Sequence, residues 1–307
     1  MRAVVIDEFN TDPRVRKLPS PDAGDGEIVV DVDYSSVNGM DLFTCNGMVQ
    51  HMMPYQFPIT LGRDFAGTVS AVGAGVSGLA VGDPVFGMLV TAHLHGGTFA
   101  ERASVPAYCA AKRPHGLDPE DAGALGLAGG AARASVDALG LCPGETVLIC
   151  GATGGVGAFA IQMAKRRGAT VVATARPEQA DFVERFGADE IVDYSSDLAG
   201  ELRALHPDGV DCIIHLAGDG IALADLIVPG GRLVSTLGVG PEAVAGHDVR
   251  ATPVMTIPSL GLLEGLANEV VQGDLRVPIT HRYSLDEAAQ AIRDFGASAL
   301  GKLGVTV

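Results

Sequence analysis

A glycine-rich loop between a short apolar strand and a helix constrains the fold of this chain more than any other feature. Thr146–Cys150 (TVLIC) reads as a buried strand, Gly151–Gly157 (GATGGVG) follows as the loop, and Val156–Arg167 has helical spacing. A second apolar stretch, Thr170–Thr174 (TVVAT), comes next. Strands that alternate with helices in this way are typical of a parallel sheet covered by helices on both faces.

The same alternation extends in both directions from this loop. A helix start stands at Asp118-Pro119, with Asp as the N-cap, Pro at the first helical position and acidic residues in the first turn. Further apolar strands are expected at Glu190–Val192, Cys212–His215 and Arg232–Ser235, with a helix at Pro177–Phe186. We therefore predict a doubly wound α/β domain over residues 118–274.

The rest of the chain has a different sequence pattern. Residues 1–117 show short Val- and Ile-rich strands separated by Gly, Pro and Asp turns, as in Ala3–Asp7, Glu27–Tyr34 and Thr68–Val72. This pattern predicts a small barrel-like β domain. The tail is mixed, with a helix expected at Leu260–Gln272 and a second at Leu285–Phe295.

Composition excludes several classes of function. The 21 Lys and Arg residues against 37 Asp and Glu give a net charge of −16, which argues against a nucleic-acid or anionic-membrane surface. The five cysteines are scattered without a CxxC pair, and this indicates a reducing compartment. No signal-like or membrane-spanning apolar run is present. We expect a cytoplasmic protein without nucleic-acid or membrane partners.

The glycine loop also predicts a ligand. Glycines after a strand permit a tight turn and close backbone approach, and the following helix N-terminus attracts phosphate charge. The strict GxGxxG is not met, because the glycines stand at positions 151, 154, 155 and 157, but the flanking strands and helix favour a dinucleotide site. The residues expected to contact its phosphates are Thr153, Gly154, Gly155, Val156 and Gly157.

The end of the second strand indicates which dinucleotide binds. An NAD site usually has Asp or Glu about 20 residues beyond the glycines, where it binds the ribose hydroxyls. Here the chain reads Thr174-Ala175-Arg176-Pro177, without a carboxylate. A guanidinium is suited to a 2′-phosphate, so the sequence favours NADPH.

A series of short motifs runs along the whole chain. They are Val37–Asp41 (VNGMD), Leu61–Gly67 (LGRDFAG), Val81–Gly87 (VGDPVFG), Gly96–Glu101 (GGTFAE), Leu125–Gly130 (LGLAGG), Pro143–Gly157, Pro229–Ser235 (PGGRLVS) and Gly301–Val307 (GKLGVTV). In this order they resemble the zinc-independent quinone oxidoreductase (zeta-crystallin-like) group of the medium-chain dehydrogenase/reductase superfamily. The resemblance covers essentially the whole chain and implies an α/β protein. A GroES-like β-rich domain would be formed from residues 1–117 and 275–307, with a Rossmann domain inserted over residues 118–274.

The resemblance also implies cofactor contacts. Asn38 resembles an asparagine beside the nicotinamide, and Lys302 falls in the closing GK motif near the cofactor. The backbone that usually lines the nicotinamide half corresponds to Leu216, Ala217, Leu237 and Gly238. The 2′-phosphate pocket of the group corresponds to Thr174 and Arg176, and Tyr194 resembles a tyrosine near the adenosine phosphate.

No catalytic residue can be carried over from the group. Zinc-containing members place Cys and His where this chain has Asn38 and Arg63, so no metal is expected. The tyrosine of mitochondrial-type enoyl reductases corresponds to Val49 here. The catalytic residue is thus unknown, and the pocket candidates are Asn38, Phe43, Tyr55, Arg63 and His95.

These observations predict an NADPH-dependent reductase that delivers hydride to a quinone or to an enone- or enoyl-type double bond in a small, apolar, carbonyl-conjugated substrate. Two alternatives stay open: a non-catalytic NADPH-binding protein like the lens crystallins of this group, and a biosynthetic enoyl reductase with a dedicated substrate. Val254–Ile257 reads as the final edge strand of the parallel sheet, and an apolar edge of this kind favours a homodimer.

Overall fold

A computed structural model describes all 307 residues, and contacts divide the chain into two compact units. Unit 1 comprises Met1–Gly130 and Ile257–Val307, and unit 2 comprises Ala131–Thr256. The sequence placed the limits at 117/118 and 274/275 instead. Helix α7 (Leu260–Val271) packs against strand β8 (Ala110–Lys112), which explains why contacts assign it to unit 1. The expected limits of the functional domains stay a prediction.

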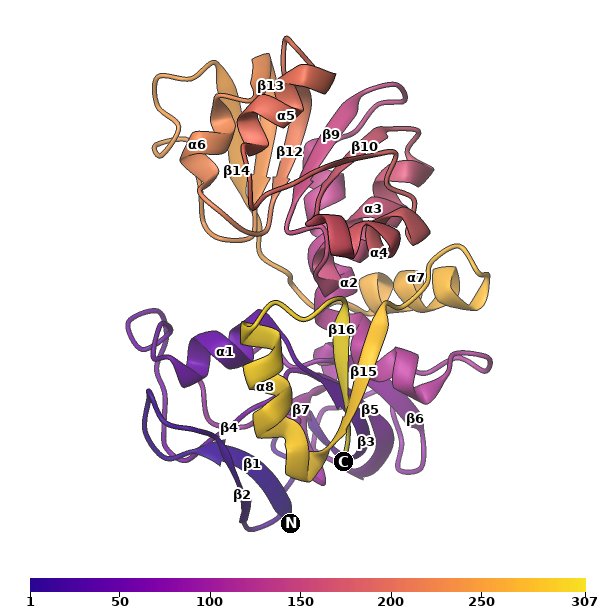
Figure 1. Cartoon of the computed structure of the whole chain (residues 1–307). Helices are drawn as coiled ribbons and strands as arrows, with labels where there is room; N and C mark the ends of the chain where they lie inside the picture. Colours follow the sequence, from indigo (N-terminus) through magenta and orange to yellow (C-terminus); the bar gives the residue numbers. More distant parts are fainter. The chain divides into compact units, whose positions relative to one another are not determined.

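Unit 2 is built on a six-stranded sheet in which every strand pair is parallel (Figure 1). The strand order is β11-β10-β9-β12-β13-β14, so the order reverses between β9 and β12. This is the doubly wound arrangement expected from the sequence. The elements of unit 2, after α2 (Pro119–Leu139), are β9 (Thr146–Cys150), α3 (Gly155–Arg166), β10 (Thr170–Thr174), a 3₁₀ turn (Pro177–Gln179), α4 (Ala180–Arg185), β11 (Glu190–Val192), α5 (Leu198–Leu205), β12 (Val210–His215), α6 (Gly220–Ala224), β13 (Ile227–Ser235) and β14 (Val249–Pro253).

Burial explains why these stretches form this sheet. Val147, Leu148 and Ile149 of β9 are fully buried, as are the central residues of β10 and β12. Such strands lack the polar alternation of a half-exposed sheet because helices cover both of their faces. The parallel arrangement brings the carboxyl ends of β9, β10, β12 and β13 to one edge of the sheet, where ligands of this fold bind.

The prediction of an edge strand at Val254–Ile257 is wrong. The edge strand is β14, which pairs residue by residue with β13 from Gly231–Val249 to Ser235–Pro253. Val254–Ile257 follows it without strand structure, and Met255 and Ile257 are 84% and 74% exposed. The position of the edge strand is therefore set by pairing with β13 and not by the local strand preference of Val254–Ile257. The strand can end in Pro253 because an edge strand pairs on one side only.

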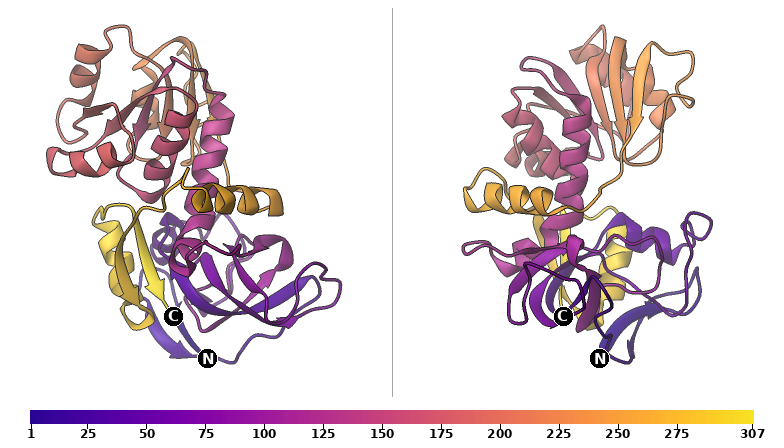
Figure 2. Two further views of the ribbon diagram at one scale, coloured as in Figure 1. Left: turned by 90° about the vertical axis from the view of Figure 1, so that its right-hand side faces the viewer. Right: turned by 180° about the vertical axis from the view of Figure 1, so that it is seen from behind.

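Unit 1 is mainly β structure and joins both ends of the described chain. A seven-stranded sheet follows the path β15-β16-β3-β5-β6-β8, with β7 paired to β3, and a three-stranded sheet follows β2-β1-β4. Helix α8 packs against β15 and β16, which are yellow in the left view of Figure 2. The remaining elements of unit 1 are β1 (Arg2–Ile6), β2 (Arg14–Lys17), β3 (Glu27–Ser36), α1 (Gly39–Cys45), β4 (Ile59–Thr60), β5 (Asp64–Val72), β6 (Pro84–Met88), β7 (Arg102–Pro106), a 3₁₀ turn (Ala107–Cys109), β15 (Ile279–Ser284), a 3₁₀ turn (Leu285–Glu287), α8 (Ala288–Gly296) and β16 (Lys302–Thr306).

Unit 1 has several apolar clusters, of which two are larger. One gathers β1, α1 and α8 around Ile6, Leu61, Phe99 and Ile292. The other packs on the seven-stranded sheet around Ile28, Phe65 and Val85. No helix of the structure combines the length and apolar character needed to cross a bilayer.

Candidate active site

The glycine loop has the geometry that a phosphate cradle requires. Gly151 has φ of +86°, a conformation that side chains rarely adopt, and Gly154 caps α3. A Cβ on Gly157 would lie 2.3 Å from the Gly151 carbonyl oxygen, so only glycine lets α3 approach the loop this closely. Gly154 has no such neighbour within 3.4 Å, which leaves its face of the loop open. The expected strand–loop–helix unit is thus confirmed, and its residues fit a pyrophosphate at the start of α3.

Thr174, expected in the 2′-phosphate pocket, has its hydroxyl bonded to backbone. It is 3% exposed, donates to the Ile149 carbonyl over 3.2 Å and accepts from the Gly151 amide over 3.0 Å. These bonds tie the end of β10 to the glycine loop at the end of β9. In this structure Thr174 therefore braces the loop.

Arg176 stands at the carboxyl end of β10 with an accessible side chain. Its side chain is 41% exposed, and its Nε lies 3.2 Å from the Glu178 carboxylate. The Arg176 amide donates to Gln179 Oε1, and the Tyr194 hydroxyl donates to the same oxygen over 3.4 Å. Gln179 therefore connects the backbone of Arg176 to Tyr194, which places both predicted adenosine-side residues on one surface.

The two loops expected to line the nicotinamide half follow β12 and β13. The Leu216 amide donates to the Cys150 carbonyl over 3.0 Å, and a Cβ on Gly151 would lie 3.1 Å from the Cβ of Leu216. Leu216 and Ala217 thus pack directly on the glycine loop, whereas Leu237 and Gly238 follow the next strand along the same edge.

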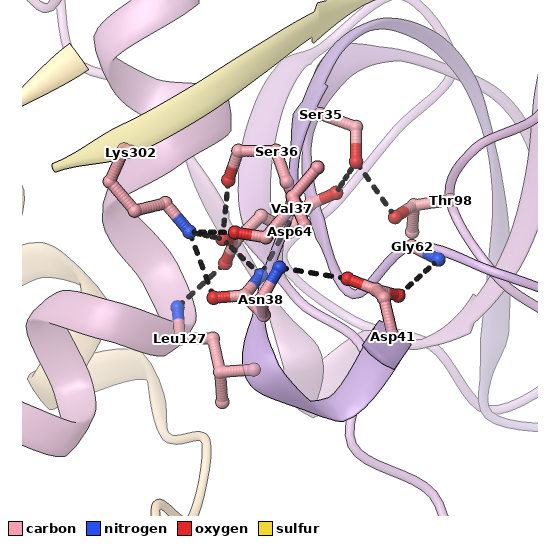
Figure 3. Close-up of polar contacts among 10 residues, drawn as sticks. All are labelled: Ser35, Ser36, Val37, Asn38, Asp41, Gly62, Asp64, Thr98, Leu127 and Lys302. Carbon is pink, nitrogen blue, oxygen red and sulfur yellow. Dashed lines mark hydrogen bonds and ion pairs between the residues drawn. The ribbon is translucent and has the colours of Figure 1, made fainter. Parts of the chain in front are cut away.

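Unit 1 holds a buried polar cluster centred on Asp64, which sequence reasoning missed (Figure 3). Asp64 is 0% exposed and lies at the start of β5, and Lys302, at the start of β16, is 2% exposed. Lys302 Nζ donates to Asp64 Oδ2 over 3.1 Å, to Asn38 Oδ1 over 2.8 Å and to the Val37 carbonyl over 2.9 Å. All three of its protons are therefore used within the cluster.

The Asp64 carboxylate is fully coordinated by donors. Its Oδ1 accepts from the Leu127 amide over 2.6 Å, and its Oδ2 also accepts from Ser36 Oγ and from Asn38 Nδ2. A carboxylate that is removed from water in this way is stable only when paired and hydrogen-bonded. The one signal in the sequence was the charged Arg63-Asp64 pair inside the LGRDFAG motif.

The cluster also fixes the orientation of Asn38. Its Oδ1 accepts from Lys302, and its Nδ2 donates to Asp64 and to the Ser36 carbonyl. Both amide protons are thus consumed, and only the second lone pair of Oδ1 remains to accept from a ligand.

Next to Asn38, Asp41 caps the start of α1. Its carboxylate accepts from the amides of Asn38 (2.8 Å) and Gly62 (2.7 Å). Burial raises the pKa of the Asp41 carboxyl, and the nearby positive charge of Arg63 opposes this rise. Burial lowers the pKa of the Arg63 guanidinium, which is 4% exposed. Arg63 Nη1 makes one long bond of 3.5 Å to the Gly96 carbonyl, and Nη2 has no hydrogen-bond partner.

The three remaining pocket candidates make no hydrogen bond to this cluster. Phe43 packs against the apolar cluster around α1 and α8. Tyr55 is 41% exposed and its ring meets Phe9 edge-on at 4.8 Å. His95 Nδ1 lies 3.1 Å from the Gln56 carbonyl. Their assignment to a substrate pocket stays a prediction.

Comparison with known sequence families agrees with both units. Residues 24–115 match the family described as alcohol dehydrogenase GroES-like domain, and residues 155–256 match the one described as zinc-binding dehydrogenase. The match to the zinc-binding dehydrogenase family does not include Asn38 or Arg63, the two positions compared above with zinc ligands. The expected fold class, a GroES-like region with a Rossmann-type parallel sheet, is confirmed.

Individual relatives cover the full length of the chain. The chloroplast envelope quinone oxidoreductase homolog of Arabidopsis thaliana is 30% identical over 94% of this chain and 92% of its own length. The quinone oxidoreductase structure from Coxiella burnetii is 27% identical, covers 100% of this chain and 99% of its own, and superposes with a TM-score of 0.90. The chain therefore belongs to the quinone oxidoreductase-like branch of the medium-chain dehydrogenase/reductase superfamily, whose members are NAD(P)-binding oxidoreductases.

A relative of another kind matches only through one of its parts. A mycocerosic acid synthase-like polyketide synthase of Mycobacterium tuberculosis is 35% identical over 91% of this chain, but the match covers 14% of that much longer protein.

Proposed function

We propose that this chain is a zinc-independent reductase that uses NADPH to reduce a quinone or an enone-type double bond conjugated to a carbonyl. The observation that carries the proposal is the carboxyl edge of unit 2, where a glycine cradle stands beside an accessible Arg176. The loop is open at Gly154, where a Cβ would meet no atom within 3.4 Å, and no carboxylate takes the ribose-binding place at the end of β10. An arginine there suits the 2′-phosphate.

The side chains at the positions of the zinc ligands support the zinc-independent part of the proposal. In zinc-containing relatives these positions carry Cys and His, whereas here Asn38 is bonded to the Lys302 ammonium and Arg63 is a buried guanidinium. Neither position offers a thiolate or an imidazole to bind a divalent cation. We expect purified protein to contain less than stoichiometric zinc by elemental analysis and to keep its activity after chelation; loss of activity with removal of zinc would contradict this.

The chain's own residues then have separate roles. Bound NADPH supplies the hydride. The glycine loop and Arg176 hold the phosphates, and Asn38 offers one acceptor lone pair to a ligand N–H. Arg63 Nη2 is a buried donor without a partner, which is unusual in folded proteins, and it suits the carbonyl oxygen of the substrate. Water can supply the proton that completes the reduced product.

The polyketide synthase relative favours a second candidate, a biosynthetic enoyl reductase. Its substrate would be an enoyl thioester rather than a quinone, and the same hydride chemistry would apply. Steady-state turnover with NADPH separates the candidates. A simple quinone, a simple enone and a crotonyl thioester are compared at equal concentration, with NADH in parallel reactions. Turnover of none of them, with tight NADPH binding, would instead support the non-catalytic alternative.

We also propose that the protein is a homodimer joined through the edge of the parallel sheet, now placed at β14 rather than Val254–Ile257. The outer side of β14 has no strand partner within the chain, and a two-fold mate would complete it. Light scattering at micromolar concentration is expected to give twice the chain mass, and a monomeric mass would contradict the proposal.

A further inference from the structure

Two buried polar residues end neighbouring strands at the carboxyl edge of unit 2. His215 is the last residue of β12 and Ser235 the last of β13, and they are paired in the strand register. They are 2% and 0% exposed. Each strand then continues into a loop that faces the glycine cradle side of the sheet, and neither residue has a part in the function proposed above.

Hydrogen bonds from this pair reach both loops. His215 Nε2 lies 3.1 Å from the Gly218 carbonyl, and Nδ1 lies 3.0 Å from Ser235 Oγ. Ser235 Oγ also accepts from the amides of Leu237 (3.0 Å) and Val239 (3.2 Å). The pair is therefore bonded to the loop after β12 and to the loop after β13.

The partners define the tautomer of His215. A carbonyl only accepts, so Nε2 carries the proton that bonds to Gly218. Nδ1 then accepts the hydroxyl proton of Ser235, whose oxygen receives the two backbone amides. Every polar side-chain atom of this pair has a partner. Gly220 closes over the ring, because a Cβ there would lie 2.7 Å from imidazole atoms.

The first of these loops also contacts the cradle. The Leu216 amide bonds to Cys150 at the end of β9, and the side chain of Leu216 lies against Gly151. In a doubly wound sheet a dinucleotide crosses the switch point, with one half on each side of the first strand. Arg176 lies on the β10 side, so the nicotinamide half belongs on the β12–β13 side.

We propose that His215 and Ser235 are positioning residues that set the spacing of the loops Leu216–Gly218 and Leu237–Val239, and through them the nicotinamide half of the bound cofactor. The pair is bonded to loop backbone and is itself buried, so its action on the cofactor is indirect. This inference rests on the proposed function, since it assumes that the edge holds NADPH.

The test compares a whole cofactor with half of one. Adenosine 2′,5′-bisphosphate carries the 2′-phosphate but no nicotinamide, so its affinity reports on the Arg176 side alone. In Ser235→Ala the dissociation constant for NADPH is expected to rise roughly tenfold, the equivalent of about one hydrogen bond to a buried group. The constant for adenosine 2′,5′-bisphosphate is expected to stay within about twofold, which also shows that the variant is folded.

Two further variants make the comparison decisive. Ser135→Ala is the matched control, because Ser135 is also 0% exposed and its hydroxyl donates only to Ala131 within α2; both ligands are expected to bind it as before. His215→Gln removes the Nδ1 acceptor and is expected to reproduce the Ser235→Ala result. The inference is overturned if both variants bind NADPH as the unchanged chain does, or if both ligands weaken equally. If the unchanged chain binds neither ligand, the proposed function itself fails.

Discussion

Lys302 and Arg176 are both cations that the sequence assigned to the cofactor, yet the structure places them in opposite environments. Lys302 is 2% exposed, is paired with a fully buried carboxylate and has no free proton. Arg176 has a side chain 41% exposed, and its Nε lies 3.2 Å from the carboxylate of Glu178 two residues away. The first charge is paired inside unit 1 and orients Asn38, whereas the second lies at the surface. Burial thus separates two cations whose assignment to the cofactor stays a prediction in both cases.

The largest expected effect comes from removing the buried charge. Lys302→Met leaves Asp64 without its counter-ion and is expected to lower the free energy of unfolding by about 3–5 kcal/mol. Arg176→Met, at an exposed position, is expected to change it by no more than about 0.5 kcal/mol. Urea denaturation of both variants checks this. Equal losses would show that the two cations do not differ in the way described.

For NADPH binding, we expect the larger effect from the exposed cation, Arg176. Arg176→Ala is expected to raise the KM for NADPH by roughly tenfold or more, because it removes a charge-assisted bond to the 2′-phosphate. The KM for NADH and the kcat at saturation are expected to stay unchanged. Arg176→Lys serves as the control and should fall between, since it keeps the charge but not the planar fork. An equal effect on both cofactors would make Arg176 structural.

The glycine loop allows stability and binding to be separated within one segment. Gly157→Ala places a Cβ against the Gly151 carbonyl and is expected to cost about 1–3 kcal/mol of stability. Gly154→Ala meets no atom within 3.4 Å, so the free protein should unfold almost normally while NADPH binds more weakly. Thermal unfolding with and without NADPH measures both effects. Identical behaviour of the two variants would contradict the geometry of the loop.

The smallest effect concerns the neighbour of Arg176. Glu178→Gln removes the carboxylate 3.2 Å from the guanidinium, and this exposed pair contributes little. The KM for NADPH is expected to fall by about twofold, and Glu184→Gln, a nearby acidic residue on α4, is the control. A rise in KM would mean that Glu178 positions Arg176 rather than competes for it.

Local patterns were predictable, and distant pairings were not. The strand before the glycine loop, the loop itself and β10 follow from apolar runs and glycine spacing over some thirty residues, and all three are confirmed. Asp64 and Lys302 lie 238 positions apart, so no local pattern could connect them. The edge strand was misplaced for the same reason: pairing of β14 with β13 is a tertiary contact that local preference does not encode.

The Lys302–Asp64 pair has a consequence for how the chain is made. Synthesis proceeds from the first residue, so β5 and its carboxylate leave the ribosome long before Lys302 does. Residues 131–256 contain every strand of their own sheet, so all of that sheet has been synthesised before Lys302. The β domain, by contrast, must wait with Asp64 unpaired and β3 lacking its β16 neighbour. The C-terminal strand β16, which is synthesised last, thus completes the β domain that is synthesised first.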